Sequence, residues 1–233
     1  MLNLLAFFEE GFLNIFLDNL LIGIIPLIII LLIIILIVKI SNKKSSKDRK
    51  KFIKLLKEDN DSNFSRTKDI DKDFFYIPDI NILPIKDYDS DSKIFSRQKK
   101  AIEMIDKKMV KFKTEKSNIE LKKMFGASNL EYIIRYEENF ARYMQSLRLW
   151  AESLLEINDT ESAKIILKES ISAGSEISYS YTILADIYFK NKDNKEILRL
   201  KTIVENSNFP AKLNVLSYIN SLLQKIDIEN EVD

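Results

Sequence analysis

A run of nineteen residues, Leu20 to Val38, contains no charged side chain and consists mostly of Ile and Leu. About 20 apolar residues in a helix cross the ~30 Å hydrocarbon layer of a bilayer. As a buried helix, the run would need a larger soluble core than this chain offers. As a cleaved signal peptide, it would follow basic residues, whereas Glu9, Glu10 and Asp18 precede it. The sequence therefore predicts an uncleaved, single-pass transmembrane helix over residues 20–38, in contact with the lipid bilayer.

Lysine and arginine are distributed unevenly around this predicted span. No basic residue precedes it, whereas Lys39 to Lys57 carries nine basic residues against one acidic residue. Because basic flanks stay on the cytoplasmic side, we expect the C-terminal domain in the cytoplasm and residues 1–19 on the other side of the membrane. The excess of Ile, Lys and Asn is typical of an AT-rich bacterial genome, which indicates the bacterial inner membrane. A periplasmic C-terminal domain is the alternative.

The residue types that enzymes commonly use are scarce. The chain has no Cys, no His and only four Gly. This composition excludes disulfides, the usual zinc sites and the commonest general base, and it leaves little material for a glycine-rich phosphate loop. We therefore expect no enzymatic activity, no catalytic residue, no metal and no cofactor.

Residues 39–95 are interpreted as a basic juxtamembrane stretch followed by a flexible linker. The linker, Glu58 to Lys93, is mostly polar and charged on either side of one apolar segment, and its polar parts show no periodicity. Within the linker, Phe74 to Ile85 is apolar and is interrupted by Pro78 and Pro84, which favour an extended backbone. Two interpretations stay open for this apolar segment. It is either a strap on the surface of the chain's own domain or a docking peptide for another protein.

Residues 96–127 are predicted to form one basic amphipathic helix. Ile102, Ile105, Met109 and Phe112 have heptad spacing, and Gly126 is a plausible end for the helix. Arg97 to Lys123 carries ten basic residues against four acidic ones. Aromatic interleaving and a recognised motif are missing, so we expect a solvated helix face and no binding to nucleic acid.

Residues 128–233 have the strongest helical pattern, and the pattern repeats after 34 residues. Asp159 and Asp193, one period apart, are each expected to cap the second helix of a pair. Val215, Tyr218, Ile219 and Leu222 begin a third partial copy. The apolar residues that align are Leu147 with Tyr181, Trp150 with Leu184, Ala151 with Ala185, Leu154 with Tyr188, and Ala163 with Ile197.

A period of 34 with paired helices resembles the tetratricopeptide-repeat (TPR) family. Leu147, Trp150, Ala151 and Leu154 match the first helix of its motif, and "YTILADIYFK" matches it best in the next copy. The resemblance covers about a third of the chain. It implies an all-α fold in which helical hairpins stack into an α-solenoid, with residues 128–233 as the repeat domain and the last helix as a cap.

The resemblance also implies protein binding through a groove that the first helix of each pair lines. The function we expect is a membrane-tethered scaffold or adaptor for other proteins, themselves membrane-associated. The alternative is a structural component of a bacterial envelope or flagellar-motor assembly, with the repeat domain in the periplasm. The predicted partner groove consists of Gln145, Arg148, Glu152, Leu155, Tyr179, Thr182, Asp186 and Phe189, continued by Leu213, Leu216, Asn220 and Leu223.

Overall fold

The computed structural model describes residues 30–39 and 47–232, with side chains up to residue 226. Most of this part of the chain is helical and almost none of it is strand, which confirms the all-α class. The chain divides into two compact units, Met1–Asn63 and Phe64–Asp233.

The first unit contains two helical stretches among its described residues, 30–39 and 47–62. The predicted outer segment, 1–19, and the first half of the predicted span, 20–29, lie outside the described residues. None of the described helices is both long and apolar enough to cross a membrane. The basic juxtamembrane stretch is helical over 47–57, and this helix continues to residue 62, so the flexible linker predicted from Glu58 onward is wrong for 58–62. No Pro or Gly interrupts the helix, whose apolar residues have helical spacing.

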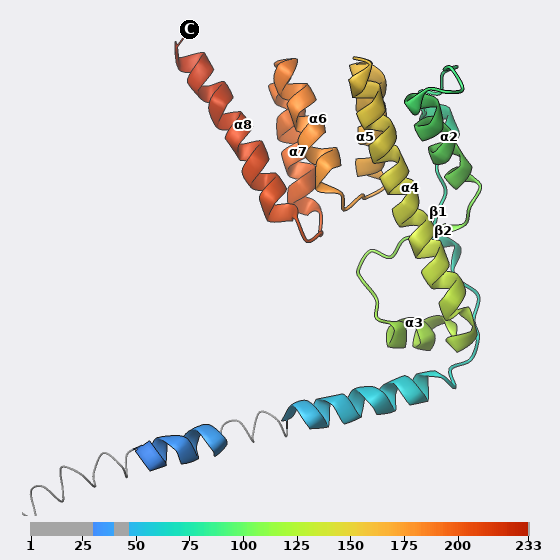
Figure 1. Cartoon of the computed structure of the whole chain (residues 1–233), viewed down its shortest axis with the longest axis vertical. Helices are drawn as coiled ribbons and strands as arrows, with labels where there is room; N and C mark the ends of the chain where they lie inside the picture. The colour runs from blue at the N-terminus through green and yellow to red at the C-terminus, as the bar shows by residue number, and fades with distance from the viewer. Residues whose placement is uncertain (1–29, 40–46, 233) are drawn as a thin grey trace, which may run out of the picture. The chain divides into compact units, whose positions relative to one another are not determined.

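Five helices after residue 129 make up most of the second unit. Each packs against the one before it, and α8 also packs against α6, so that the helices follow one another across the unit (Figure 1). The helices are α4 (Leu130–Glu156), α5 (Thr160–Ser172), α6 (Ser178–Lys190), α7 (Asn194–Asn206) and α8 (Lys212–Val232).

The turn from α4 to α5 recurs between α6 and α7, 34 residues later. Asn158 and Lys192 are the two non-glycine residues with positive φ among those described, at 59° and 56°. The next residue in each turn, Asp159 or Asp193, accepts a hydrogen bond from the backbone three residues on. Both predicted helix caps are confirmed, and α5 and α7 have the same length of 13 residues.

The residues that align between the two copies form the centre of the main core. All ten aligned side chains are at most 4% exposed. On α8 the pattern continues with Val215, Ile219 and Leu222, which are buried. Tyr218, also predicted as part of this third copy, is instead 36% exposed, because no further described helix covers that side of α8. Its hydroxyl donates to Asp186 Oδ1 at 2.5 Å.

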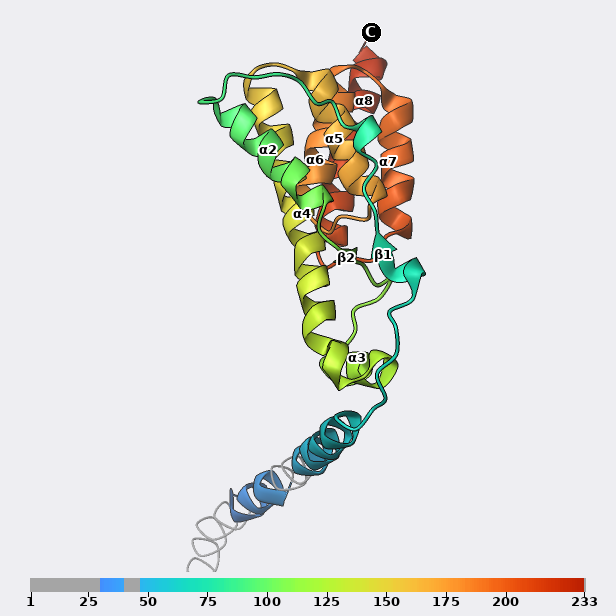
Figure 2. The same ribbon diagram turned by 90° about the vertical axis from the view of Figure 1, so that its right-hand side faces the viewer.

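The apolar segment Phe74 to Ile85 is a strap along α5, as Figure 2 shows. The Tyr76 hydroxyl donates to Glu169 Oε1 at 2.5 Å, and beyond the segment the Lys86 ammonium donates to Asp159 Oδ2 at 2.5 Å. Leu83 is buried in the main core. These contacts confirm the strap, and the docking-peptide interpretation stays a prediction. The elements of the strap are η1 (Lys72–Phe74), β1 (Phe75–Tyr76) and η2 (Ile80–Ile82).

The single helix predicted over residues 96–127 is wrong. The region contains α2 (Lys93–Ile105), β2 (Met109–Val110) and α3 (Asn118–Phe125). Strand β2 pairs antiparallel with β1 and is buried, so pairing with the strap replaces helix there. Ser117 starts α3 afresh with a capping box to Glu120, and Gly126 ends it at φ 89°, as expected.

The predicted boundary at residue 128 falls in η3 (Ala127–Asn129), inside the second unit. Helix α2 packs against α4, and α3 contacts the start of α4. A smaller core joins this region to the strap through Val110, Phe112, Leu121, Phe125 and Ile133. The helices after residue 128 therefore share their packing with the strap, α2 and α3.

Candidate partner-binding site

The eight positions of the predicted partner groove lie on two helices of the second unit. Helix α4 carries Gln145, Arg148, Glu152 and Leu155, and α6 carries Tyr179, Thr182, Asp186 and Phe189. Gln145 is exposed and the other seven are half-buried. Because they recur at spacings of three and four, each set follows one face of its helix.

Arg148 brings four of these positions from both helices together, and one contact is the hydrogen bond that its guanidinium donates to the side-chain oxygen of Gln145. The same guanidinium donates to the Glu152 carboxylate and lies 5.3 Å from the centre of the Tyr179 ring. Burial raises the pKa of the Tyr179 hydroxyl, and the charge of Glu152 adds to the effect. The result is a partly desolvated cluster in which the charge of Arg148 is already balanced within the chain.

Of the remaining groove positions, Thr182 donates from its hydroxyl to the backbone carbonyl oxygen of Tyr179, and the other three do not contact the cluster through a hydrogen bond or an ion pair. Asp186 accepts from Tyr218 of α8, and this hydrogen bond raises the pKa of Tyr218 to about 12. Leu155 and Phe189 pack against the main core. Of the α8 positions, Leu213 and Asn220 are exposed, whereas Leu216 and Leu223 pack against the same core. The predicted groove is thus divided between an α4–α6 cluster and an α6–α8 contact.

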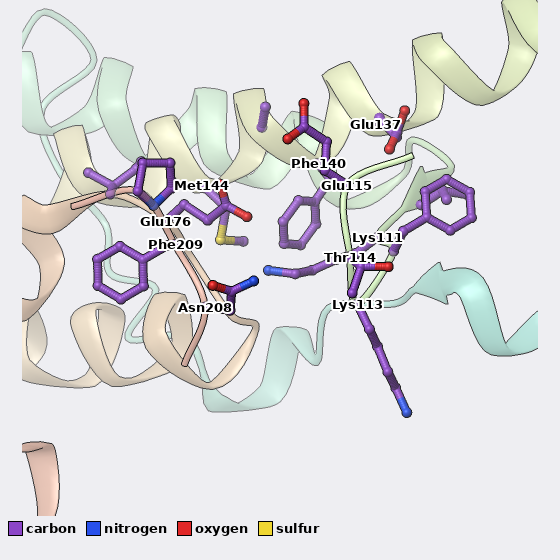
Figure 3. Close-up of a pocket in the computed structure, with 15 residues that line it drawn as sticks. Lys111, Lys113, Thr114, Glu115, Glu137, Phe140, Met144, Glu176, Asn208 and Phe209 are labelled. Atoms are coloured by element: carbon purple, nitrogen blue, oxygen red, sulfur yellow. The ribbon is translucent and has the colours of Figure 1, made fainter. Parts of the chain in front are cut away.

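A pocket of about 590 Å³ lies elsewhere in the second unit (Figure 3). Its walls come from the loop after β2, the first half of α4, and the loops that precede α6 and α8. The lining residues are Val110, Lys111, Phe112, Lys113, Thr114, Glu115, Glu137, Phe140, Ala141, Met144, Glu176, Ile177, Asn208, Phe209 and Pro210.

Lys111 reaches across this pocket and joins two of its walls. Its ammonium donates to the carbonyl oxygen of Gly174 and lies 4.9 Å from the centre of the Phe140 ring. Figure 3 shows Lys111 extending into the pocket, whereas Lys113 points away. Burial lowers the pKa of Lys111, and the charge of Glu176 partly opposes this change.

Three carboxylates, of Glu115, Glu137 and Glu176, also line the pocket. Burial raises the pKa of Glu137, and repulsion from Glu115 adds to it. Apolar side chains, among them Met144 and Phe209, complete the wall. Among the described residues, no group of His, Cys, Asp or Glu could hold a metal ion. The pocket therefore combines charge of both signs with apolar surface, and it is suited to enclosing part of a chain or a small amphipathic molecule.

Replacing Glu137 with glutamine is expected to stabilise the second unit at neutral pH, by less than ~1 kcal/mol because the side chain is partly exposed. The pKa of Glu137 is raised above its ordinary 4.5, so the native state binds its proton more tightly than the unfolded state does. The stability that protonated Glu137 contributes is therefore fully present below pH 4.5, and it is lost as the pH rises through the pKa of Glu137 in the folded state. The gain should therefore shrink on acidification. Urea unfolding at several pH values measures it, and a gain that is independent of pH would show that the charge of Glu137 does not destabilise the native state.

Comparisons with protein-family models, with curated proteins and with solved structures find no match to this chain.

Proposed function

We propose that the second unit is a TPR-like protein-binding module and that Leu20 to Val38 tethers it to the bacterial inner membrane. The protein then acts as a scaffold or adaptor for membrane-associated partners. The observation that carries the proposal is the 34-residue repeat of geometry, in which α5 and α7 have equal lengths, equivalent caps and the same positive-φ residue before the cap. Stacked helical hairpins of this kind present an extended surface formed by one helix of each pair.

The burial pattern supports the same proposal. The TPR motif has Trp at the positions of Leu147 and Tyr181 and Gly at the positions of Ala151 and Ala185, and all four of these side chains are buried. Small residues at the Gly positions allow close helix approach. Ala stands where the motif has Gly in both copies, and a methyl group still fits between the helices.

The α4–α6 cluster has the composition of an interaction surface. Arg and Tyr are enriched among residues that dominate binding energies. Arg148 and Tyr179 are partly desolvated and held in place by their mutual contact, so less side-chain freedom is lost when a partner covers them. We therefore assign partner binding to this cluster, of which Gln145 is the exposed member.

The membrane tether gives the module its role in this proposal. A partner in the same membrane meets the module at a raised effective concentration, so a weak contact is sufficient for association. The basic residues after Leu20 to Val38 favour a cytoplasmic module.

A combined Arg148→Ala and Tyr179→Ala variant is expected to lose its partner in the cell. Interface anchors of these types each contribute ~2 kcal/mol or more, so that the pair changes affinity by about a hundredfold or more. A photo-crosslinking amino acid at Gln145 in the full chain captures the partner, which mass spectrometry identifies. The double variant should then abolish that specific crosslink.

The matched control is a Leu198→Ala and Arg199→Ala variant, which changes an apolar and an arginine side chain on the exposed side of α7. It should leave the crosslink at Gln145 unchanged. If the double variant keeps the crosslink at full strength, the α4–α6 cluster does not bind the partner. If the double variant melts far below the control, the two side chains serve folding and the assignment is equally contradicted.

A further inference from the structure

The helix at residues 47–62 has an apolar face that no other described residue covers. Phe52, Ile53, Leu55 and Leu56 are 60%, 55%, 45% and 53% exposed. Phe52, Leu55 and Leu56 are three and four residues apart and share one face, with Ile53 at its edge. Four large apolar side chains on two turns form a surface that is unfavourable in water.

A stripe of lysines follows the opposite face of the same helix. Its members are also three and four residues apart, which places them in one row along the axis. Over the first three turns, six basic residues stand against one acidic residue, Asp48. The lysines of the stripe are Lys47, Lys50, Lys51, Lys54 and Lys57.

We propose that the first three turns of this helix lie in the surface of an anionic lipid bilayer. A helix with an apolar face and a lysine-rich opposite face places its apolar side chains at the boundary of headgroups and acyl chains, and its lysines at the anionic headgroups. Both faces are then satisfied by one partner. After Lys57 the sequence turns acidic with Glu58, Asp59 and Asp61, and repulsion from the same headgroups ends the contact there.

Charge complementarity favours the bilayer over a second copy of this protein as the partner of the helix. A second copy would cover the apolar face by bringing two lysine-rich helices side by side, where like charges repel. An anionic bilayer instead supplies negative headgroups that the long lysine side chains can reach from the opposite face of the helix. The inference goes beyond the proposed function, because it needs neither the repeat nor the partner surface and adds a preference for anionic membranes.

The test uses the absence of cysteine from the chain, which makes single-cysteine spin labelling clean. The full-length protein, with one label at a time, is reconstituted into vesicles of phosphatidylcholine with phosphatidylglycerol. Labels at Phe52, Ile53 and Leu56 should be accessible to oxygen and shielded from a polar relaxation reagent. Labels at Lys50 and Lys54 should show the reverse, so that accessibility oscillates with a period of about 3.6 residues.

The same scan in phosphatidylcholine alone should lose most of this oscillation, as should a variant in which the five lysines of the stripe are replaced by glutamine. Equal oscillation in neutral vesicles contradicts the anionic preference. If labels at Phe52 and Leu56 are shielded from both oxygen and the polar reagent, protein covers the apolar face, and the proposal is overturned. A scan without periodicity would also overturn it.

The proposed membrane span and the proposed lipid binding by residues 47–57 can be tested separately. Release of the protein from cell membranes at alkaline pH would contradict the proposed span over Leu20 to Val38. Flotation of the released full chain with phosphatidylglycerol vesicles, and its absence with phosphatidylcholine vesicles, would still support lipid binding by residues 47–57. Absence of flotation with both would overturn it.

Discussion

Replacing Trp150 with alanine is expected to lower the free energy of unfolding of the second unit by ~3–5 kcal/mol. The Trp150 side chain is fully buried in the main core, between α4 and its neighbours. Removing it leaves a cavity that rigid helices fill only in part. Because small domains are stable by only ~5–15 kcal/mol, this single change removes a large share of the total. Urea unfolding of residues 64–233, followed by circular dichroism at helical wavelengths, measures the difference.

Trp150→Phe is the matched control. It keeps an aromatic ring in the core, and it loses no hydrogen bond, because the indole N–H has no partner among the described residues. Its cost should therefore be well under half that of the alanine variant. A Trp150→Ala variant as stable as the wild type would show that the core is not centred on this residue.

Gly126→Ala is expected to destabilise the second unit by about 2–6 kcal/mol, through two effects of ~1–3 kcal/mol each. Gly126 has φ 89° and ψ 150°, a region that is open essentially to glycine alone. A methyl group there would also lie 2.6 Å from the Thr67 Cα and 2.8 Å from the Arg66 carbonyl oxygen. Both are backbone atoms, so no rotamer change relieves the clash. Differential scanning calorimetry of residues 64–233 measures the loss.

Gly174→Ala separates the two effects. Gly174 also has a positive φ, of 78°, but the atom nearest an added methyl group is the ammonium nitrogen of Lys111, at 2.6 Å. A flexible side chain can move, so this variant should cost less than Gly126→Ala. Equal melting temperatures for the two variants would mean that the contact with Thr67 is not rigid.

The helical repeat could be predicted from the sequence because its signals are local. The cap at Asp159 and the cap at Asp193 each depend on residues within one turn, and periodic apolar positions mark the buried faces. Trp150 and Leu184 were placed in the core by the same periodicity. Where a residue's environment depends on what covers it, as at Tyr218, the pattern alone failed.

The region from residue 96 to 127 could not be predicted because its structure depends on distant partners. Met109 fits a helical spacing, yet with Val110 it forms β2 by pairing with the strap. The pocket was missed for the same reason, since Glu137, Glu176 and Asn208 belong to segments whose meeting is set by the packing of α4 to α8. The only sequence signal for the pocket is that each loop lining it contains both apolar and charged or polar residues.

The predicted partner groove was only partly assembled by the fold. Periodicity placed Arg148 and Glu152 on one face of α4, and the packing of α6 added Tyr179. Leu155 and Phe189 have the same spacing, but they turn toward the main core. Spacing identifies a face, and the neighbouring helix decides which end of that face stays open.

The strap has a consequence for the order of events during synthesis. Tyr76 bonds to Glu169, 93 residues further along the chain, and Lys86 bonds to Asp159, 73 residues further along. At ~5–20 residues per second, a ribosome needs roughly 4–20 s to complete α5 after making the strap. Throughout that interval Leu83 and the ring of Tyr76 lack the helix that covers them. The nascent chain therefore exposes an apolar segment beside the translating ribosome before the domain can close, which makes this segment a natural target for chaperones.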